Sequence, residues 1–237
     1  MNAAMNVELA CAIAYQKEYL ESYGYSLKVG HDFHEFNRLC ENIKKDVTEH
    51  FSPIFNTLLP ISSFWIMLTD PDGRPVGTVA SRLEVFTDGA TVASYLRSYL
   101  PRIYQTADGL PVQLAEKQPS FCEEASGRVV YLGEAHTVES ARRNGLGGSL
   151  VKLIQLVSLL RFEPDYLYCW IRPRHAESGF PQACGYKEVF PRAIRWIRPP
   201  APKSAVQDLW LAGNRRGGLL DLVGDVLAER DALGCTK

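Results

Sequence analysis

Residues 142–148 (RRNGLGG) combine the residue types that proteins use to bind phosphate groups. Gly145, Gly147 and Gly148 let backbone N–H groups approach an anion closely, because glycine has no side chain in the way. Arg142 and Arg143 add side-chain donors whose positive charge strengthens a hydrogen bond to phosphate. Chemistry on a phosphorylated ligand is therefore the first hypothesis for this chain.

The flanking segments indicate what kind of loop this is. A strand-forming segment at 128–138 precedes it, and a strongly apolar, helix-forming segment at 145–162 follows it. The start of a helix attracts anions through its unpaired N–H groups and its dipole. The loop lacks the Lys-Ser or Lys-Thr of a nucleotide P-loop and the GxGxxG spacing of a dinucleotide-binding fold. A plain turn, with glycines for packing and arginines for solubility, is the competing interpretation.

Hydrophobic periodicity predicts the elements that must position this loop. Helical patterns cover 7–23, 33–47, 90–105 and 176–184, and a further helix covers 219–227. Strand-forming runs at 63–69 and 75–86 flank a Pro- and Gly-containing turn, which predicts a β-hairpin. Residues 106–126 are polar and uneven in pattern, so we expect a long loop there.

Further strands are expected at 166–171, 186–190 and 194–197, with an additional strand near 206–212. Strands that alternate with helices between 128 and 190 predict parallel neighbours. No repeat or composition shift marks a second domain. We therefore expect one α/β domain over 1–237, with a helical region at 1–55, a core at 60–198 and a strand and helix at 203–237.

Composition narrows the function classes. With 26 basic and 27 acidic side chains, the chain has no overall charge that would attract nucleic acid. The N-terminus does not resemble a signal peptide, and no apolar stretch is long enough to span a membrane. The six cysteines are scattered singly, which predicts reduced thiols and a cytoplasmic protein. His31 and His34 have helical spacing but no third ligand, so no metal site is predicted.

The segment 128–189 resembles the acetyl-CoA-binding core of the GNAT acyltransferases (Gcn5-related N-acetyltransferases). The family's [Q/R]xxGx[G/A] signature is matched by Arg142, Gly145 and Gly147, and the stretches 173–176 (PRHA) and 185–189 (GYKEV) look like its later helix and strand. The match is firm over about a quarter of the chain and extends to about half when the hairpin is included.

The resemblance implies a fold, a cosubstrate and a reaction. The fold is α/β, with a mixed, mostly antiparallel central sheet flanked by helices and with extra helices at both termini. The cosubstrate is acetyl-CoA or another acyl-CoA, lying where the sheet splits, with no metal. The reaction is acyl transfer to an amine of a small molecule or peptide. The implied cosubstrate-binding residues are Ala135, Thr137, Val138, Arg142, Arg143, Asn144, Gly145, Leu146, Gly147 and Gly148.

Acyl transfer to an amine requires the neutral form, which costs a lysine-like amine about 4 to 5 kcal/mol at pH 7. The candidates for removing this proton are Glu134, then His136, then Tyr131, all on the strand before the loop. Alternation places Glu134 and His136 on one face and Tyr131 on the other, unless a bulge changes the phase. The alternatives are that Glu134 pairs with an arginine and that His136 is a core histidine with its hydrogen bonds satisfied.

The tyrosine that many relatives use as general acid is absent, because Pro181 occupies its place. Tyr186, His175 and Cys184 are nearby substitutes. Three alternatives therefore stay open: a catalytically degenerate domain that binds CoA or a partner protein, a donor carried by acyl carrier protein as in N-acyl amino acid synthases, and a homodimer.

Overall fold

A computed structural model of the chain describes residues 1–142, 145–201 and 207–234. Its centre is a seven-stranded sheet in the order β1-β2-β3-β5-β6-β9-β7, and β4 pairs with β8 in a second, two-stranded sheet. Within the large sheet only β5 and β6 run parallel. This arrangement confirms the predicted mixed, mostly antiparallel sheet flanked by helices.

The elements in chain order are α1 (Ala3–Glu21), β1 (Ser26–Gly30), α2 (Phe33–Glu41), η1 (Glu49–Phe51), β2 (Ser63–Thr69), β3 (Pro75–Phe86), α3 (Val92–Ile103), β4 (Gln113–Leu114), α4 (Ser120–Glu124), β5 (Gly127–Thr137), η2 (Glu139–Ala141), α5 (Leu146–Phe162), β6 (Tyr166–Ile171), α6 (Pro173–Glu177), α7 (Phe180–Ala183), β7 (Glu188–Phe190), β8 (Trp196–Arg198), β9 (Trp210–Arg215) and α8 (Arg216–Gly234).

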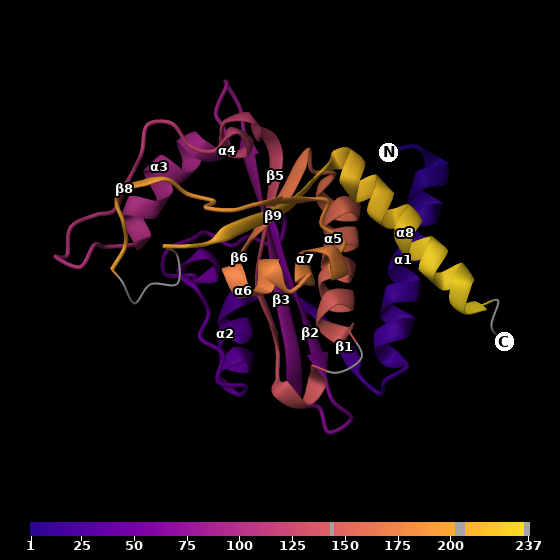
Figure 1. Ribbon diagram of the computed structural model, residues 1–237. Helices are drawn as coiled ribbons and strands as arrows, with labels where there is room; N and C mark the ends of the chain where they lie inside the picture. The colour runs from indigo at the N-terminus through magenta and orange to yellow at the C-terminus, as the bar shows by residue number, and fades with distance from the viewer. Residues whose placement is uncertain (143–144, 202–206, 235–237) are drawn as a thin grey trace.

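Helices cover both faces of the large sheet (Figure 1). One face packs against α1, α5 and α8, and the other packs against α2, η1, α3 and α4. Strand β2 shows why both faces are buried: Phe64 and Ile66 point to the α5 side, whereas Trp65 and Met67 point to the α2 side. We call these the α5 face and the α2 face.

Local sequence signals explain several element boundaries. Asp32 caps α2 by accepting hydrogen bonds from the backbone N–H groups of His34 and Glu35 at 2.8 and 3.2 Å. The predicted hairpin forms between β2 and β3, where Asp70 accepts from the backbone of Asp72 and Arg74. The predicted helices at both ends of the chain also form, as α1 and α8.

Four expectations about the elements were wrong in part. Strand β1 was missed, because it is an edge strand with a mostly exposed, polar pattern. The expected loop at 106–126 contains β4 and α4. The expected helix at 176–184 is divided by Gly179, whose φ of 77° leaves the helical region. Strand β9 lies between β6 and β7, so only one parallel pair forms.

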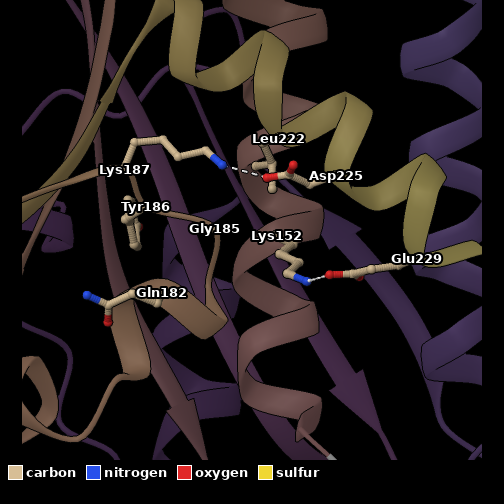
Figure 2. A pocket seen from close by; sticks show the side chains of 8 residues that line it. All are labelled: Lys152, Gln182, Gly185, Tyr186, Lys187, Leu222, Asp225 and Glu229. Atoms are coloured by element: carbon tan, nitrogen blue, oxygen red, sulfur yellow. Dashed lines mark hydrogen bonds and ion pairs between the residues drawn. The ribbon is translucent and has the colours of Figure 1, made fainter.

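The C-terminal helix α8 is held against α5 and the turn before β7. Lys152 on α5 pairs with Glu229 at 2.5 Å, and Lys187 pairs with Asp225 at 2.5 Å (Figure 2). These pairs line a cavity of about 300 Å³ between the two helices and Gly185. Because its cations and carboxylates are paired with one another, this cavity holds no unpaired charge for a ligand.

Replacing Gly185 with alanine is expected to loosen this junction. The residue has a φ of 79°, and an added Cβ would collide with the buried Leu222 side chain of α8. Backbone strain and overpacking together should lower the free energy of unfolding by about 2 to 3 kcal/mol, measured by urea denaturation.

Gly179→Ala is the matched control. Gly179 has a φ of 77° but has open space around it, so this variant should lose only about 1 kcal/mol, from backbone strain. Equal losses in the two variants would contradict tight packing of α8 against Gly185.

Candidate active site

Strands β5 and β6 part half-way along their length. They pair only from Val129 to Leu132 and from Tyr166 to Cys169, although β5 continues to Thr137. Beyond Leu132, β5 remains paired with β3 only. As a result Ala135 is exposed, although β5 is an inner strand of the sheet. This free edge can take an extended ligand.

A β-bulge lies at the start of the free edge. Glu134 has a φ of 60°, and the register with β3 shifts so that two residues, Glu134 and Ala135, oppose Val79 alone. Thr78 holds the bulge by donating its hydroxyl to the Glu134 carbonyl at 2.7 Å. The bulge changes the face of the sheet to which the side chains beyond it point, a possibility that the sequence left open.

The expectation that Tyr131 and Glu134 lie on opposite faces was therefore wrong. Both side chains lie on the α2 face. The Tyr131 ring packs against His50 and Phe51 of η1, with ring centroids 5.1 and 5.6 Å apart. The Glu134 carboxylate accepts hydrogen bonds from the backbone N–H of Thr48, at 3.0 Å, and from its hydroxyl.

Glu134 also forms an ion pair with Lys45, and its side chain is completely buried. The residue was the first candidate for the base, with pairing to an arginine as the alternative, and its partner in the structure is a lysine instead. A buried carboxylate with three donors around it fixes the 42–48 segment to the bulge. This geometry favours a positioning role for Glu134.

His136 lies two residues beyond the bulge and is half-buried. Burial lowers the pKa of its imidazole, and the positive charges of Lys45 and Arg142 lower it further. The imidazole is therefore neutral at pH 7 and can accept a proton. His136 meets the requirement for a base better than Glu134 does.

The start of α5 lies at the far end of the free edge. Gly145 precedes the helix with a φ of 70°, and no side chain of the described residues caps the first turn. Gly147 lies beside Thr137, whose carbonyl accepts a hydrogen bond from Arg142 Nε at 3.1 Å. Leu146 is buried, and Val138 is half-buried. Of the predicted loop residues, Arg143 and Asn144 lie outside the described residues.

Positive charge gathers near this helix start. Burial lowers the pKa of His175, and so do the charges of Arg174, Arg172 and Arg142, in that order. Two of these arginines, Arg172 and Arg174, lie at the start of α6, and Arg142 lies shortly before α5. An uncapped helix start beside several arginines favours an anionic ligand such as a phosphate.

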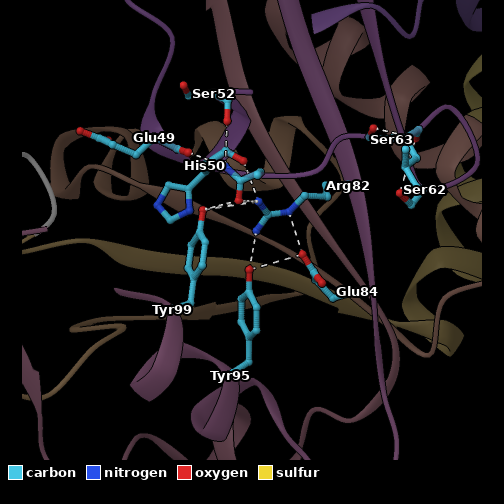
Figure 3. Close-up of polar contacts among 11 residues, drawn as sticks. Glu49, His50, Ser52, Ser62, Ser63, Arg82, Glu84, Tyr95 and Tyr99 are labelled. Atoms are coloured by element: carbon cyan, nitrogen blue, oxygen red, sulfur yellow. Dashed lines mark hydrogen bonds and ion pairs between the residues drawn. The ribbon is translucent and has the colours of Figure 1, made fainter. Parts of the chain in front are cut away.

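The α2 face of the parting point is lined by aromatic rings around a buried arginine (Figure 3). The Arg82 guanidinium donates to the His50 carbonyl and the Asn56 amide oxygen at 2.7 Å, and to the Tyr95 hydroxyl at 2.8 Å. It also pairs with Glu84 at 3.0 Å. The charge is therefore compensated within the fold.

Two ionisable groups on this face stay neutral. Burial, and then the charge of Arg82, hold the pKa of His50 well below its ordinary value. Burial raises the pKa of Tyr131 well above its ordinary value. At neutral pH the His50 imidazole is therefore uncharged, and the Tyr131 phenol keeps its proton.

Two of the substitutes for the missing tyrosine, Tyr186 and Cys184, lie on the opposite face of the sheet from Tyr131. Pro181 is buried in α7. Tyr186 and Cys184 are buried on the α5 face, and His175 packs against Phe180 with ring centroids 5.9 Å apart. Sequence reasoning did not identify His50, Arg82 or Trp170. Their positions depend on contacts between segments far apart in the chain, so no local pattern could have indicated them.

No family model and no curated protein matches this chain. Solved structures similar to it include Arabidopsis thaliana NAA60 in complex with acetyl-CoA, at 12% identity and a TM-score of 0.47, covering 81% of this chain and 98% of that one. Another is the aminoglycoside acetyltransferase AAC(6')-Ib with coenzyme A and kanamycin, at 14% identity and a TM-score of 0.44, covering 81% and 96%.

A third similar structure is the spermidine/spermine N-acetyltransferase SpeG from Vibrio cholerae, at 9% identity and a TM-score of 0.44, covering 84% of this chain and 98% of that one. These TM-scores lie below 0.5, so the strand order and the bulge of the chain itself define its fold. Among the described residues, no helix has both the length and the apolar character needed to cross a membrane.

Removing the Glu134 carboxylate charge is expected to destabilise the fold. Glu134→Gln leaves Lys45 without its partner in a buried setting, so the free energy of unfolding should fall by about 3 kcal/mol in a urea titration. The double variant Lys45→Met/Glu134→Gln should lose less than the sum of the single variants. Additive losses would show that the two side chains do not interact.

Proposed function

We propose that this chain is an N-acyltransferase of the GNAT type that transfers an acyl group, first of all acetyl, from acyl-CoA to an amine of a small molecule or peptide. The observation that carries the proposal is the free edge of β5, which runs from the bulge at Glu134 to the uncapped start of α5. A strand edge can pair with the amides of the pantetheine arm, and a helix start can hold its diphosphate.

The chain's own residues suit this ligand. The backbone of Ala135, Thr137 and Val138 would lie along the pantetheine arm, and the N–H groups of Gly147 and Gly148 would face the diphosphate. Arg142, together with Arg172 and Arg174 at the start of α6, would supply the positive charge. A bound acyl-CoA would supply an activated acyl carbonyl. Attack by the amine nitrogen would form the amide C–N bond and break the thioester C–S bond, and CoA would leave as a thiolate that takes up the proton lost by the amine.

We assign the removal of the amine proton to His136, because it is neutral and half-buried beside the bulge. Glu134 holds the 42–48 segment in place, and Tyr131 lines the acceptor side. The same proposal treats residues 1–237 as one cytoplasmic domain that needs no metal, nucleic acid or membrane. An acyl carrier protein as donor and a homodimeric assembly are alternatives within it.

Thiol release from acetyl-CoA with a panel of amines tests the proposal directly. Release with at least one amine supports transfer. CoA binding in calorimetry without release on any amine would favour a catalytically degenerate domain. A failure to bind CoA would contradict both functions.

A carboxylate placed at the start of α5 should weaken CoA binding. Gly147→Asp fits the space, because the nearest described atoms to an added Cβ belong to Thr137 and Phe180, at 3.7 to 3.9 Å. Its charge would repel the diphosphate, so the Kd for CoA should rise at least about tenfold in calorimetry. Gly217→Asp, in the open first turn of α8, makes the same change elsewhere and should leave the Kd unchanged.

Replacing His136 should remove an acid limb from the pH profile. Because its pKa is lowered, the imidazole becomes protonated only below about pH 6.5, so wild-type kcat/KM should fall as pH drops below that value. His136→Gln should reduce kcat/KM about 100-fold and abolish this limb, measured by thiol release between pH 5 and 8. His34→Gln, on the exposed side of α2, is the control. An unchanged limb in His136→Gln would exclude His136 as the base.

A further inference from the structure

Trp170 lies on β6, one residue beyond the last pair between β5 and β6, Leu132 with Cys169. Its indole is on the α2 face, where it contacts the His50 ring at 4.9 Å and the Tyr131 ring at 5.6 Å between centroids. It therefore lies across the parting strands from the bulge, on the face opposite α5.

The indole N–H of Trp170 is buried and has no hydrogen-bond partner among the described residues. The indole of Trp65, in the same core, donates to the Asp32 carbonyl at 3.1 Å. A buried donor without a partner is destabilising, so native proteins rarely leave one unless it serves a ligand or solvent.

Two phenol rings, those of Tyr131 and Tyr168, pack against the Trp170 ring with centroids 5.6 and 6.3 Å from it. Within the part of the chain that the structure describes, the hydroxyls of Tyr131 and Tyr168 form no hydrogen bond. Burial raises the pKa of both phenols well above the ordinary value, so both keep their protons. The parting point thus presents three neutral donors on one face, which a hydrogen-bond acceptor such as a carbonyl oxygen would satisfy.

We propose that the Trp170 indole N–H donates to a carbonyl oxygen next to the reacting amine of the acceptor. The acceptor would then be an α-amino amide or a peptide N-terminus in preference to a plain alkylamine. This inference rests on the proposed N-acyltransferase function. The acyl-CoA thioester, at the end of the pantetheine arm away from α5, is the other possible source of a carbonyl at this point, and the measurements below distinguish the two sources.

A site that donates a hydrogen bond to its substrate discriminates against an analogue that lacks the acceptor group, because the buried donor is then left unpaired. L-Phenylalaninamide and 2-phenylethylamine differ only in this carbonyl-bearing group. The wild-type protein should therefore have a higher kcat/KM for L-phenylalaninamide.

Trp170→Phe should raise the KM for L-phenylalaninamide about 3- to 10-fold and leave the KM values for 2-phenylethylamine and acetyl-CoA unchanged. The matched control is Trp196→Phe on β8, whose indole N–H is also buried without a partner but lies outside the large sheet. Its kinetic constants should stay at wild-type values. Equal changes for both amines, or a change in the acetyl-CoA KM alone, would overturn the inference.

A direct measurement separates this inference from the proposed function and does not depend on the variant's stability. Wild-type protein with ¹⁵N-labelled tryptophan gives four indole signals, and the one that is missing from the spectrum of Trp170→Phe belongs to Trp170. In the presence of CoA, L-phenylalaninamide should move this signal downfield, and 2-phenylethylamine should not. An unmoved signal, or movement with acetyl-CoA alone, would overturn the inference. Absence of thiol release with every amine would contradict the proposed function instead.

Discussion

The bulge at Glu134 is the constraint on which the rest of this structure depends. Left-handed backbone costs a residue with a side chain about 1 to 2 kcal/mol, so surrounding contacts must stabilise it. The Thr78 hydroxyl holds the carbonyl, while Lys45 and Thr48 hold the carboxylate. Through the carboxylate, the bulge fixes the 42–48 segment and brings η1 over the parting point of β5 and β6.

This arrangement gives the two faces of the sheet different chemistry. On the α5 face, an uncapped helix start and several arginines favour an anion. On the α2 face, two buried charges near the parting point are compensated, Arg82 by Glu84 and Lys45 by Glu134, and the rings of His50, Tyr131 and Trp170 are neutral. A ligand along the free edge of β5 would therefore extend from a charged end to a neutral one.

A feature of this structure could be predicted from the sequence when it forms from residues that lie close together in the chain. The hairpin, the amphipathic α2 and the loop before α5 were predicted from short patterns, because capping, turn formation and periodicity act within a few residues. The insertion of β9 between β6 and β7 could not be predicted, since it depends on pairs of residues that lie 39 to 49 positions apart. The roles of His50 and Trp170 were equally hidden, because their neighbours come from distant segments.

The glycines of the loop show how the structure refines a motif. An added Cβ at Gly148 would lie 3.1 Å from the Ala183 carbonyl, so packing against α7 alone accounts for that glycine. Gly145, the residue directly before α5, has a left-handed backbone, which favours glycine. Gly147 has room for a side chain and a right-handed backbone, so neither packing nor conformation requires glycine there. Gly147 and the start of α5 therefore favour an anion-binding loop. A turn without a ligand accounts for Gly145 and Gly148 but not for Gly147.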